Sequence, residues 1–189
     1  PDYVARLARH YELFKSTQRA DTQSSTTAQP STVGPAQPPM SVPEILKQLD
    51  TSLDQGEFAP YAAALRAAVA QRDAITSELI AAIQRVSADP GPYLEHPERC
   101  LHLFAIYLLA QFRETGAQDC FVRFFSLPGE QALDLTGDLV TESGAAVFAS
   151  VCGGDPAPLL RLAPDETVNE FVRGQAIDAI LVQSTWGER

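Results

Sequence analysis

The sequence contains few cysteines, and none of them are paired at a metal-binding spacing. Only three, Cys100, Cys120 and Cys152, occur among its 189 residues, and no CxxC pattern is present. An odd number of widely spaced cysteines argues against a disulfide framework. Free thiols in a reducing compartment fit better, so the composition predicts a cytoplasmic protein, and no cofactor is predicted.

Long apolar runs and targeting signals are also missing. The longest apolar run extends from Cys100 to Phe112, which is well short of the roughly 20 residues that a membrane-spanning helix needs. No charged segment followed by an apolar one opens the chain, as a secretory signal would. Because the chain begins at Pro1, we expect it to be a fragment, and an upstream signal stays an open alternative. We predict no membrane partner.

An excess of positive charge is absent as well. The net charge is −10 at pH 7, and residues 40–189 carry ten Lys and Arg against twenty-one Asp and Glu. Such an acidic chain is repelled by the phosphates of nucleic acids and by anionic lipids. The sequence therefore predicts no nucleic-acid partner and leaves a protein or peptide as the expected one.

The apolar residues that are present concentrate between Arg99 and Leu127. From Cys100 to Phe112 only His102 and Gln111 are strongly polar, so this segment has no polar face. A helix of this kind is predicted to be surrounded by other helices.

A tight turn at Glu114–Gly116 follows, where Gly116 is expected to take the left-handed conformation that ends a helix. A second helix is predicted from Ala117 to Leu127, with Cys120, Phe121, Phe124 and Phe125 on its apolar face. The two helices are predicted to form an antiparallel pair.

The N-terminal segments differ from the rest in composition. Residues 1–19 are predicted to form an amphipathic helix with apolar positions at Tyr3, Val4, Leu7, Tyr11 and Phe14. One interpretation is that this helix binds a partner or a membrane surface. The other, which we favour, is that it is the last helix of an upstream segment. Residues 20–40 are rich in Ser, Thr, Gln and Pro and are predicted to be a disordered linker. Residues 41–189 are predicted to form one helical-repeat domain.

A recurring order of segments predicts the fold class. A long apolar helix, a tight turn, a shorter helix and a Pro- or Gly-containing break occur at residues 99–129 and 139–164, and a further helix begins near Glu166. A spacing of roughly 30 to 40 residues is typical of helix-pair solenoids. We predict an all-α fold, a short HEAT-like α-solenoid of antiparallel helix pairs with an armadillo-type superhelix. Because Ile180, Leu181 and Trp186 lack a covering helix, the domain is expected to be truncated at its C-terminus.

Particular residues resemble known families. Gly153–Pro156 with Asn169–Arg173 and Ala176 resembles the turn and the Val-Arg-x-x-Ala pattern of HEAT-like repeats, the type found in phycobilisome lyases. Residues 41–185 resemble a bacterial family catalogued as a domain of unknown function, through Pro43–Leu46, Tyr107–Glu114, Phe124–Gly129, Gly137–Asp138, Thr141–Glu142 and Ala149–Asp155. The resemblance implies no activity. Members of that family often continue into a Cys-rich SEC-C zinc motif, which these residues do not include.

Four residues with the chemistry of ligands or nucleophiles are given structural interpretations. Cys100 and His102 are two positions apart, on different sides of a helix, and with His96 they still lack a fourth zinc ligand. Cys152 lies at a predicted helix C-terminus, where the helix dipole disfavours a thiolate. We therefore predict neither a metal site nor a catalytic residue.

The candidate binding residues are Asp138, Thr141, Glu142 and Asp155, which lie near predicted turns. Carboxylates serve in acid–base chemistry and bind hard cations, but either use needs a separation that the sequence does not give. The simpler interpretation is that Asp155 caps a helix and the other acids are solvated. We retain the four residues as candidates for a partner-binding surface.

Three hypotheses for function follow. The first is a non-catalytic scaffold that presents a concave acidic face to a protein or peptide, because stacked helix pairs make an extended surface. The second is a small-ligand lyase or chaperone-like enzyme, by analogy with the phycobilisome lyases. The third is a support module for a zinc-binding tail. A deep pocket lined by aromatic and titratable groups would favour the second, and a shallow groove the first.

Overall fold

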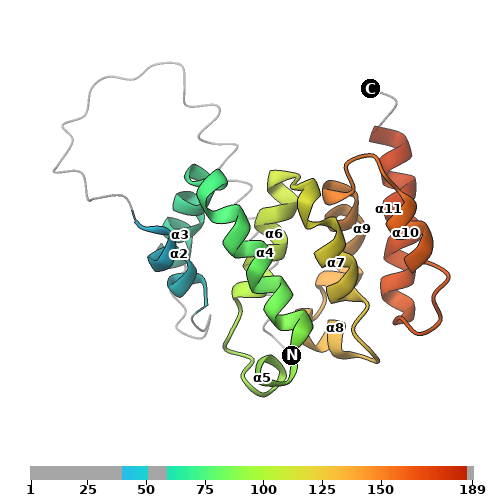
Figure 1. Ribbon diagram of the computed structural model, residues 1–189, viewed down its shortest axis with the longest axis horizontal. Helices are drawn as coiled ribbons and strands as arrows, with labels where there is room; N and C mark the ends of the chain where they lie inside the picture. Colours follow the sequence, from blue (N-terminus) through green and yellow to red (C-terminus); the bar gives the residue numbers. More distant parts are fainter. Residues whose placement is uncertain (1–39, 51–58, 187–189) are drawn as a thin grey trace.

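The computed structural model describes residues 40–50 and 59–186, and all regular structure in these residues is helical (Figure 1). The predicted all-α class is therefore confirmed, whereas the helix and linker predicted within residues 1–39 lie outside the described residues. The helices are α2 Val42–Leu49, α3 Ala59–Ala70, α4 Arg72–Ala88, α5 Gly91–Glu95, α6 Leu101–Phe112, η2 Thr115–Ala117 (a short 3-10 helix), α7 Gln118–Phe125, α8 Gln131–Thr136, α9 Leu139–Val151, α10 Ala157–Leu162 and α11 Glu170–Trp186.

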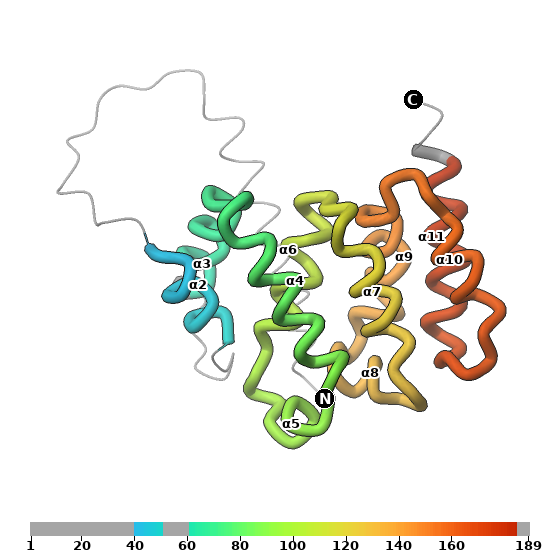
Figure 2. The backbone as a smooth tube through the Cα atoms, viewed as in Figure 1, coloured from blue at the N-terminus to red at the C-terminus, as the bar shows by residue number. Residues whose placement is uncertain are grey.

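Most of the helices lie in two rows along the long axis of the molecule (Figure 2). In one row α4 contacts α7, and α7 contacts α10. In the other row α2 contacts α6, α6 contacts α9, and α9 contacts α11. Across the rows, α4 packs on α6, α7 on α9 and α10 on α11, so chain order follows the long axis.

The grouping of helices differs from the predicted pairing of α6 with α7. Both helices form as predicted, but α6 packs most closely on α4 and α9, whereas α7 packs most closely on α4 and α10. The turn between them therefore links one row to the other. The physical reason is that α6 is apolar on all sides, so a single antiparallel partner cannot cover it.

The core is centred on α6 and on the phenylalanines of α7. Nine of the twelve residues of α6 are buried. In α7, the Phe124 and Phe125 rings lie edge to face with centroids 5.1 Å apart, and Phe125 meets Phe148 of α9 at 5.0 Å. Edge-to-face aromatic pairs add about 0.5–1.5 kcal/mol beyond the burial of their apolar area. This cluster holds the two rows together in the middle of the molecule.

The turn after α6 contains a left-handed residue, but not the predicted one. Arg113 has φ 51° and ψ 47°, and it is the only non-glycine residue with a positive φ in the described part of the chain. The Arg113 N–H donates to the Ala110 carbonyl at 3.1 Å, and the Glu114 N–H donates to the Leu109 carbonyl at 3.0 Å. The prediction for Gly116 is wrong because the helix already ends at Phe112. Gly116 lies within η2, where its N–H donates to the Glu114 side chain at 3.1 Å.

The contact between α9 and α11 depends on a glycine. A Cβ atom added to Gly144 would lie 2.9 Å from Cγ and 3.1 Å from Cβ of Gln175, so only glycine leaves room for that side chain. The Gln175 side-chain oxygen accepts the Ala145 N–H at 2.8 Å. α11 is thereby held close against α9.

Candidate functional site

A groove of about 650 Å³ lies where α6 and α9 end and where the C-terminal half of α11 passes them. The groove is open rather than enclosed. Its lining consists of Arg113, Thr115, Ala149, Ser150, Gly153, Gly154, Pro156, Ile180, Gln183 and Ser184.

The two turns that form the groove fit against each other. Gly153 and Gly154 follow α9 with φ values of 60° and 86°, which side chains rarely adopt. A Cβ atom on Gly153 would also lie 2.7 Å from Cγ2 of Thr115 in η2. The glycine pair therefore lets the end of α9 approach the turn after α6, and this approach shapes the floor of the groove.

The chemistry of the lining is mostly that of small and apolar groups. Arg113 is its one charged side chain, and no aromatic residue and no His, Cys, Asp or Glu occurs among the lining residues. The hydroxyl of Ser150 donates to the Ala146 carbonyl at 2.7 Å, and that of Ser184 donates to the Leu181 carbonyl at 2.7 Å. The groove can contact apolar side chains and a negatively charged group, but its lining offers no pair of groups for acid–base chemistry.

Cys152 lies beside the groove but is turned away from solvent. Cys152 is only 2% exposed, and its thiol donates to the Asp155 backbone carbonyl at 2.8 Å. The Gln118 amide donates to its sulfur at 3.3 Å. Burial raises the pKa of this thiol above its ordinary value. A protonated, hydrogen-bonded thiol is a poor nucleophile, so its contacts are those of a packing residue.

The four predicted binding residues lie at opposite ends of α9. Asp138 and Thr141 are exposed at its start, where the Thr141 hydroxyl donates to the Asp138 carbonyl at 3.1 Å, and Glu142 is exposed beside them. Asp155 follows the other end, about 20 Å away for a helix of 13 residues. One Asp155 side-chain oxygen accepts the Ala157 N–H at 3.0 Å, close to the predicted capping of the next helix.

The structure thus brings Asp138, Thr141 and Glu142 together and places Asp155 far from them. None of the four lines the groove. Their role in binding a partner stays a prediction, and it concerns two separate surface areas. The predicted concave acidic face does not coincide with the groove, because the lining contains no carboxylate.

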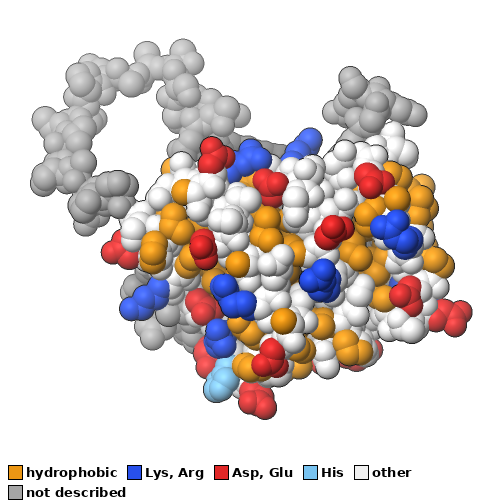
Figure 3. All heavy atoms as spheres, viewed as in Figure 1, with side chains coloured by type: hydrophobic (Ala, Val, Ile, Leu, Met, Phe, Trp, Pro, Cys, Tyr) orange, Lys and Arg blue, Asp and Glu red, His pale blue; other side chains and the backbone are white. Residues whose placement is uncertain are grey.

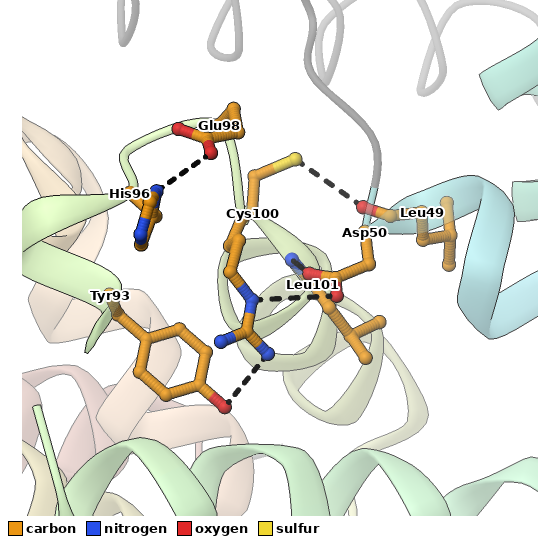
Figure 4. Close-up of polar contacts among 8 residues, drawn as sticks. Leu49, Asp50, Tyr93, His96, Glu98, Cys100 and Leu101 are labelled. Atoms are coloured by element: carbon orange, nitrogen blue, oxygen red, sulfur yellow. Dashed lines mark hydrogen bonds and ion pairs between the residues drawn. The ribbon is translucent and has the colours of Figure 1, made fainter.

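The residues weighed as metal ligands have other contacts, which Figure 4 shows for Cys100 and His96. The Cys100 thiol donates to the Leu49 carbonyl at 3.3 Å, and His96 pairs with Glu98 at 3.1 Å. His102 is buried, and its Nε2 lies 2.8 Å from the Leu135 carbonyl. Since a carbonyl can only accept, Nε2 carries the proton, and Nδ1 has no hydrogen-bond partner in the described residues.

The segment around Cys100 ties α2 to the start of α6. The Arg99 guanidinium lies 3.9 Å from the Asp50 carboxylate and 4.3 Å from the centre of the Tyr93 ring. The other Asp50 oxygen accepts the Leu101 N–H at 3.3 Å. These contacts, seen around the labelled Asp50 and Tyr93 in Figure 4, indicate a structural role for the segment. In residues 40–50 and 59–186, no three His, Cys, Asp or Glu residues are grouped so that they could hold a metal ion.

Sequence reasoning missed the lining residues Arg113, Ser150, Ile180, Gln183 and Ser184. They come from three helices that are far apart in sequence. Arg113 and Ser150 fall within segments that carry the family resemblance, but that resemblance implies no role for either of them. Only Gly153 and Gly154 gave a signal, since a glycine pair after an apolar helix marks a turn where another segment can approach. Within the described part of the chain, no helix is both long enough and apolar enough to cross a lipid bilayer.

Comparison with known proteins identifies relatives without a described activity. The sequence model of a family described as "Protein of unknown function (DUF1186)" matches residues 40–187. An uncharacterized protein of Chlamydia muridarum (strain MoPn / Nigg) is 30% identical over 118 residues, which are 62% of this chain and 47% of the relative. An uncharacterized protein of Chlamydia trachomatis serovar D is 31% identical over the same length and shares. The chain therefore spans about half the length of these relatives. No solved structure gives a significant match.

Proposed function

The chain belongs to the DUF1186 family, and we propose that it acts as a non-catalytic protein-binding scaffold of the HEAT-like, α-solenoid type. The two rows of helices support a solenoid interpretation, because each helix of the row α6, α9, α11 covers its neighbour. We also place the protein in the cytoplasm, with its three buried free cysteines as the support.

The observation that carries the proposal is the groove at the ends of α6, α9 and α11. Its open shape and its small, apolar lining suit an extended or helical peptide segment, which is recognised through apolar side chains. Arg113 supplies the one positive charge of the lining. We expect the bound segment to combine apolar residues with an acidic one, because a carboxylate can pair with the guanidinium.

The alternative of a small-ligand lyase receives less support from the same groove. Such an enzyme needs several titratable groups that converge on the ligand, and Arg113 is the only titratable side chain among the lining residues of the groove. The three described cysteines are buried, and burial raises the pKa of the Cys120 thiol to about 11. Support for a zinc-binding tail is a separate hypothesis about segments outside this chain.

The experiment that tests the proposal uses a displayed library of random peptides, selected on the full chain. The affinity of a selected peptide is then measured by fluorescence anisotropy against the wild type and two serine variants. Ser150→Arg places a large side chain inside the groove, whereas Ser87→Arg is the matched control on α4. Both serines are half-buried, and both hydroxyls donate to the carbonyl one turn earlier, at 2.7 and 2.9 Å.

We expect Ser150→Arg to weaken binding by at least about tenfold and Ser87→Arg to leave it unchanged, since a side chain in the groove excludes the peptide. Arg113→Ala should weaken the binding of peptides that carry an acidic residue more than that of their amide counterparts. Recovery of no binding peptide, or equal binding by the Ser150→Arg variant, would contradict the proposal.

A further inference from the structure

The end of α9 presents main-chain hydrogen-bonding groups that pair with no other described residue. No described residue accepts a hydrogen bond from the N–H of Gly153 or Gly154. Likewise, no described residue donates to the carbonyls of Ala149 and Ser150, which lie near the end of α9. All four residues line the groove. A helix end leaves such groups open to water or to a ligand.

The turn after α9 fixes the arrangement of the donors. The Asp155 N–H donates to the Cys152 carbonyl at 3.0 Å, and Gly153 and Gly154, the two residues between them, both have a positive φ. These are the features of a type I′ β-turn. Cys152 is right-handed helical and Gly153 has a φ of 60°, in the left-handed region. Successive N–H groups in such a conformation form a concavity that binds negatively polarised oxygen atoms.

Gly154 gives another main chain room to approach this turn. A Cβ atom added to Gly154 would meet nothing within 4 Å. Glycine is the usual residue where a ligand lies close to the backbone, because it has no side chain to hold the ligand away. In Figure 1, the turns after α6 and α9 lie at the same edge of the molecule, and residues of both line the groove. The groups that select the ligand belong to these turns and to α9, not to α11.

The side chains of the lining add little that could select a polar ligand. The hydroxyls of Ser150 and Ser184 already donate to backbone carbonyls. Arg113 is the one charged side chain of the lining. Figure 3 shows acidic and basic side chains interspersed over the face in view, without a large area of one sign. The main-chain groups at the end of α9 are therefore the most specific feature of the groove.

These groups select the conformation of a bound peptide. A helical peptide uses its own N–H and carbonyl groups within the helix, so it cannot pair with those of α9. An extended peptide has both kinds of group free along its length. We propose that the groove binds its partner as an extended peptide segment, whose carbonyls accept from Gly153 and Gly154 and whose N–H groups donate to the last carbonyls of α9. This inference rests on the proposed function and narrows the peptide to an extended one.

The side chains of the segment complete its chemistry. Successive side chains of an extended peptide point to opposite sides, so an apolar residue and an acidic residue contact different parts of the groove. The apolar side chain contacts Pro156 and Ile180, and the carboxylate pairs with the guanidinium of Arg113. The main-chain bonds supply affinity, and the two side chains supply specificity.

An N-methyl scan of a selected peptide, with anisotropy measured on the full chain, tests the proposal. Each N-methyl group removes one N–H donor from the peptide. Because alternate N–H groups of an extended segment point to the same side, the losses should recur at every second position. We expect at least about a tenfold loss of affinity at those positions, since a groove carbonyl is left unpaired, and less than about a twofold loss between them. Losses without this alternation would overturn the proposal.

A glycine pair provides the matched variants on the protein. Gly154 and Gly129 have φ values of 86° and 63°, and a Cβ atom added to either would meet nothing within 4 Å. Asparagine tolerates such a backbone better than most residues. Gly154→Asn places a side chain where the peptide approaches and should weaken binding at least about tenfold, whereas Gly129→Asn, outside the groove, should not change it. Circular dichroism establishes that both variants fold, and equal binding by both would overturn the proposal.

Carbon-13 chemical shifts of a labelled peptide bound to the full chain report its conformation directly. We expect shifts typical of extended backbone. Helical shifts in a peptide whose binding is lost in Ser150→Arg would overturn this inference and leave the proposed function standing. Binding that Ser150→Arg does not weaken would overturn the proposed function, and this inference with it.

Discussion

α6 and α11 belong to the same row of helices but are buried to very different extents. α6 has α2 and α9 as neighbours in its row and α4 across it, and nine of its twelve residues are buried. α11 has α9 on one side only, and α10 across the rows, so three of its large apolar side chains stay exposed. The comparison shows that a helix in such a row is fully buried only when it has a neighbouring helix on both sides. Among the described residues, α11 has such a neighbour on one side only.

The largest predicted difference between the two helices concerns the loss of one leucine. Leu109→Ala in α6 removes a fully buried side chain, so the free energy of unfolding should fall by about 2–5 kcal/mol. Leu181→Ala in α11 should change it by no more than about 0.5 kcal/mol, because Leu181 is 60% exposed. Urea unfolding of dilute protein measures both values. Similar losses for the two variants would break the comparison.

The next prediction compares one glycine on each of two neighbouring helices. Gly144→Ala should lower the free energy of unfolding by about 1–3 kcal/mol, because the new methyl group overlaps Cβ and Cγ of Gln175. Gly174→Ala should raise it by about 0.5–1 kcal/mol, since its methyl group enters open space and alanine favours the helix. Chemical denaturation at low protein concentration checks the opposite signs. A loss of stability for Gly174→Ala would show that the Gly174 side of α11 is already covered.

The third prediction concerns the residues that end α6 and α9 beside the groove. Arg113 and Gly153 have similar positive φ values of 51° and 60°. Arg113→Gly should raise the free energy of unfolding by up to about 1 kcal/mol, because glycine adopts this conformation without steric cost. Gly153→Ala should lower it, since its Cβ would also overlap Thr115. Thermal unfolding compares them, and a gain for Gly153→Ala would contradict the described fit of the two turns.

The last prediction concerns the pH dependence that arises from His102 of α6. Burial lowers the pKa of this imidazole below its ordinary value of 6.5. The unfolded chain therefore takes up a proton at a higher pH than the folded chain does. The contribution of the neutral His102 side chain to the free energy of unfolding is complete above about pH 6.5. It is lost as the pH falls from there towards the lower pKa of the folded state.

Unfolding free energies measured across this window for the wild type and His102→Gln test the assignment. The variant should lose the part of the decline that begins near pH 6.5. His96→Gln is the matched control, because that imidazole is exposed, and it should keep the decline of the wild type. Identical profiles for all three proteins would exclude His102 as the source.

The sequence predicted the fold better than the site. The apolar run of α6 and the Phe-rich face of α7 were sufficient to place both helices in the core, because periodicity reports burial directly. The start of α2 can also be read from the sequence, because Ser41 followed three positions later by Glu44 is the pattern of a capping box. In the structure the Ser41 N–H and hydroxyl donate to Glu44 at 2.8 and 2.6 Å. Which helix packs on which was not predictable, because a helix that is apolar all round does not indicate the direction of its neighbours.

The groove escaped prediction for a related reason. Arg113 takes a left-handed conformation that arginine rarely adopts. Nothing in the sequence indicates that Arg113 ends α6 in this conformation, because Gly116, three residues later, is of the type that usually does so. Ser150 and Gln183 lie on separate helices and meet only after α11 has packed on α9. The acidic candidates were selected by residue type, which reports a charge but not its position.

The most direct test of the difference in burial between α6 and α11 is hydrogen exchange of the dilute full chain, measured by mass spectrometry. The account predicts that the amides of α6 exchange most slowly, at rates governed by global unfolding, and that those of α11 exchange at least about tenfold faster. Protection of α11 equal to that of α6 in dilute solution would contradict it.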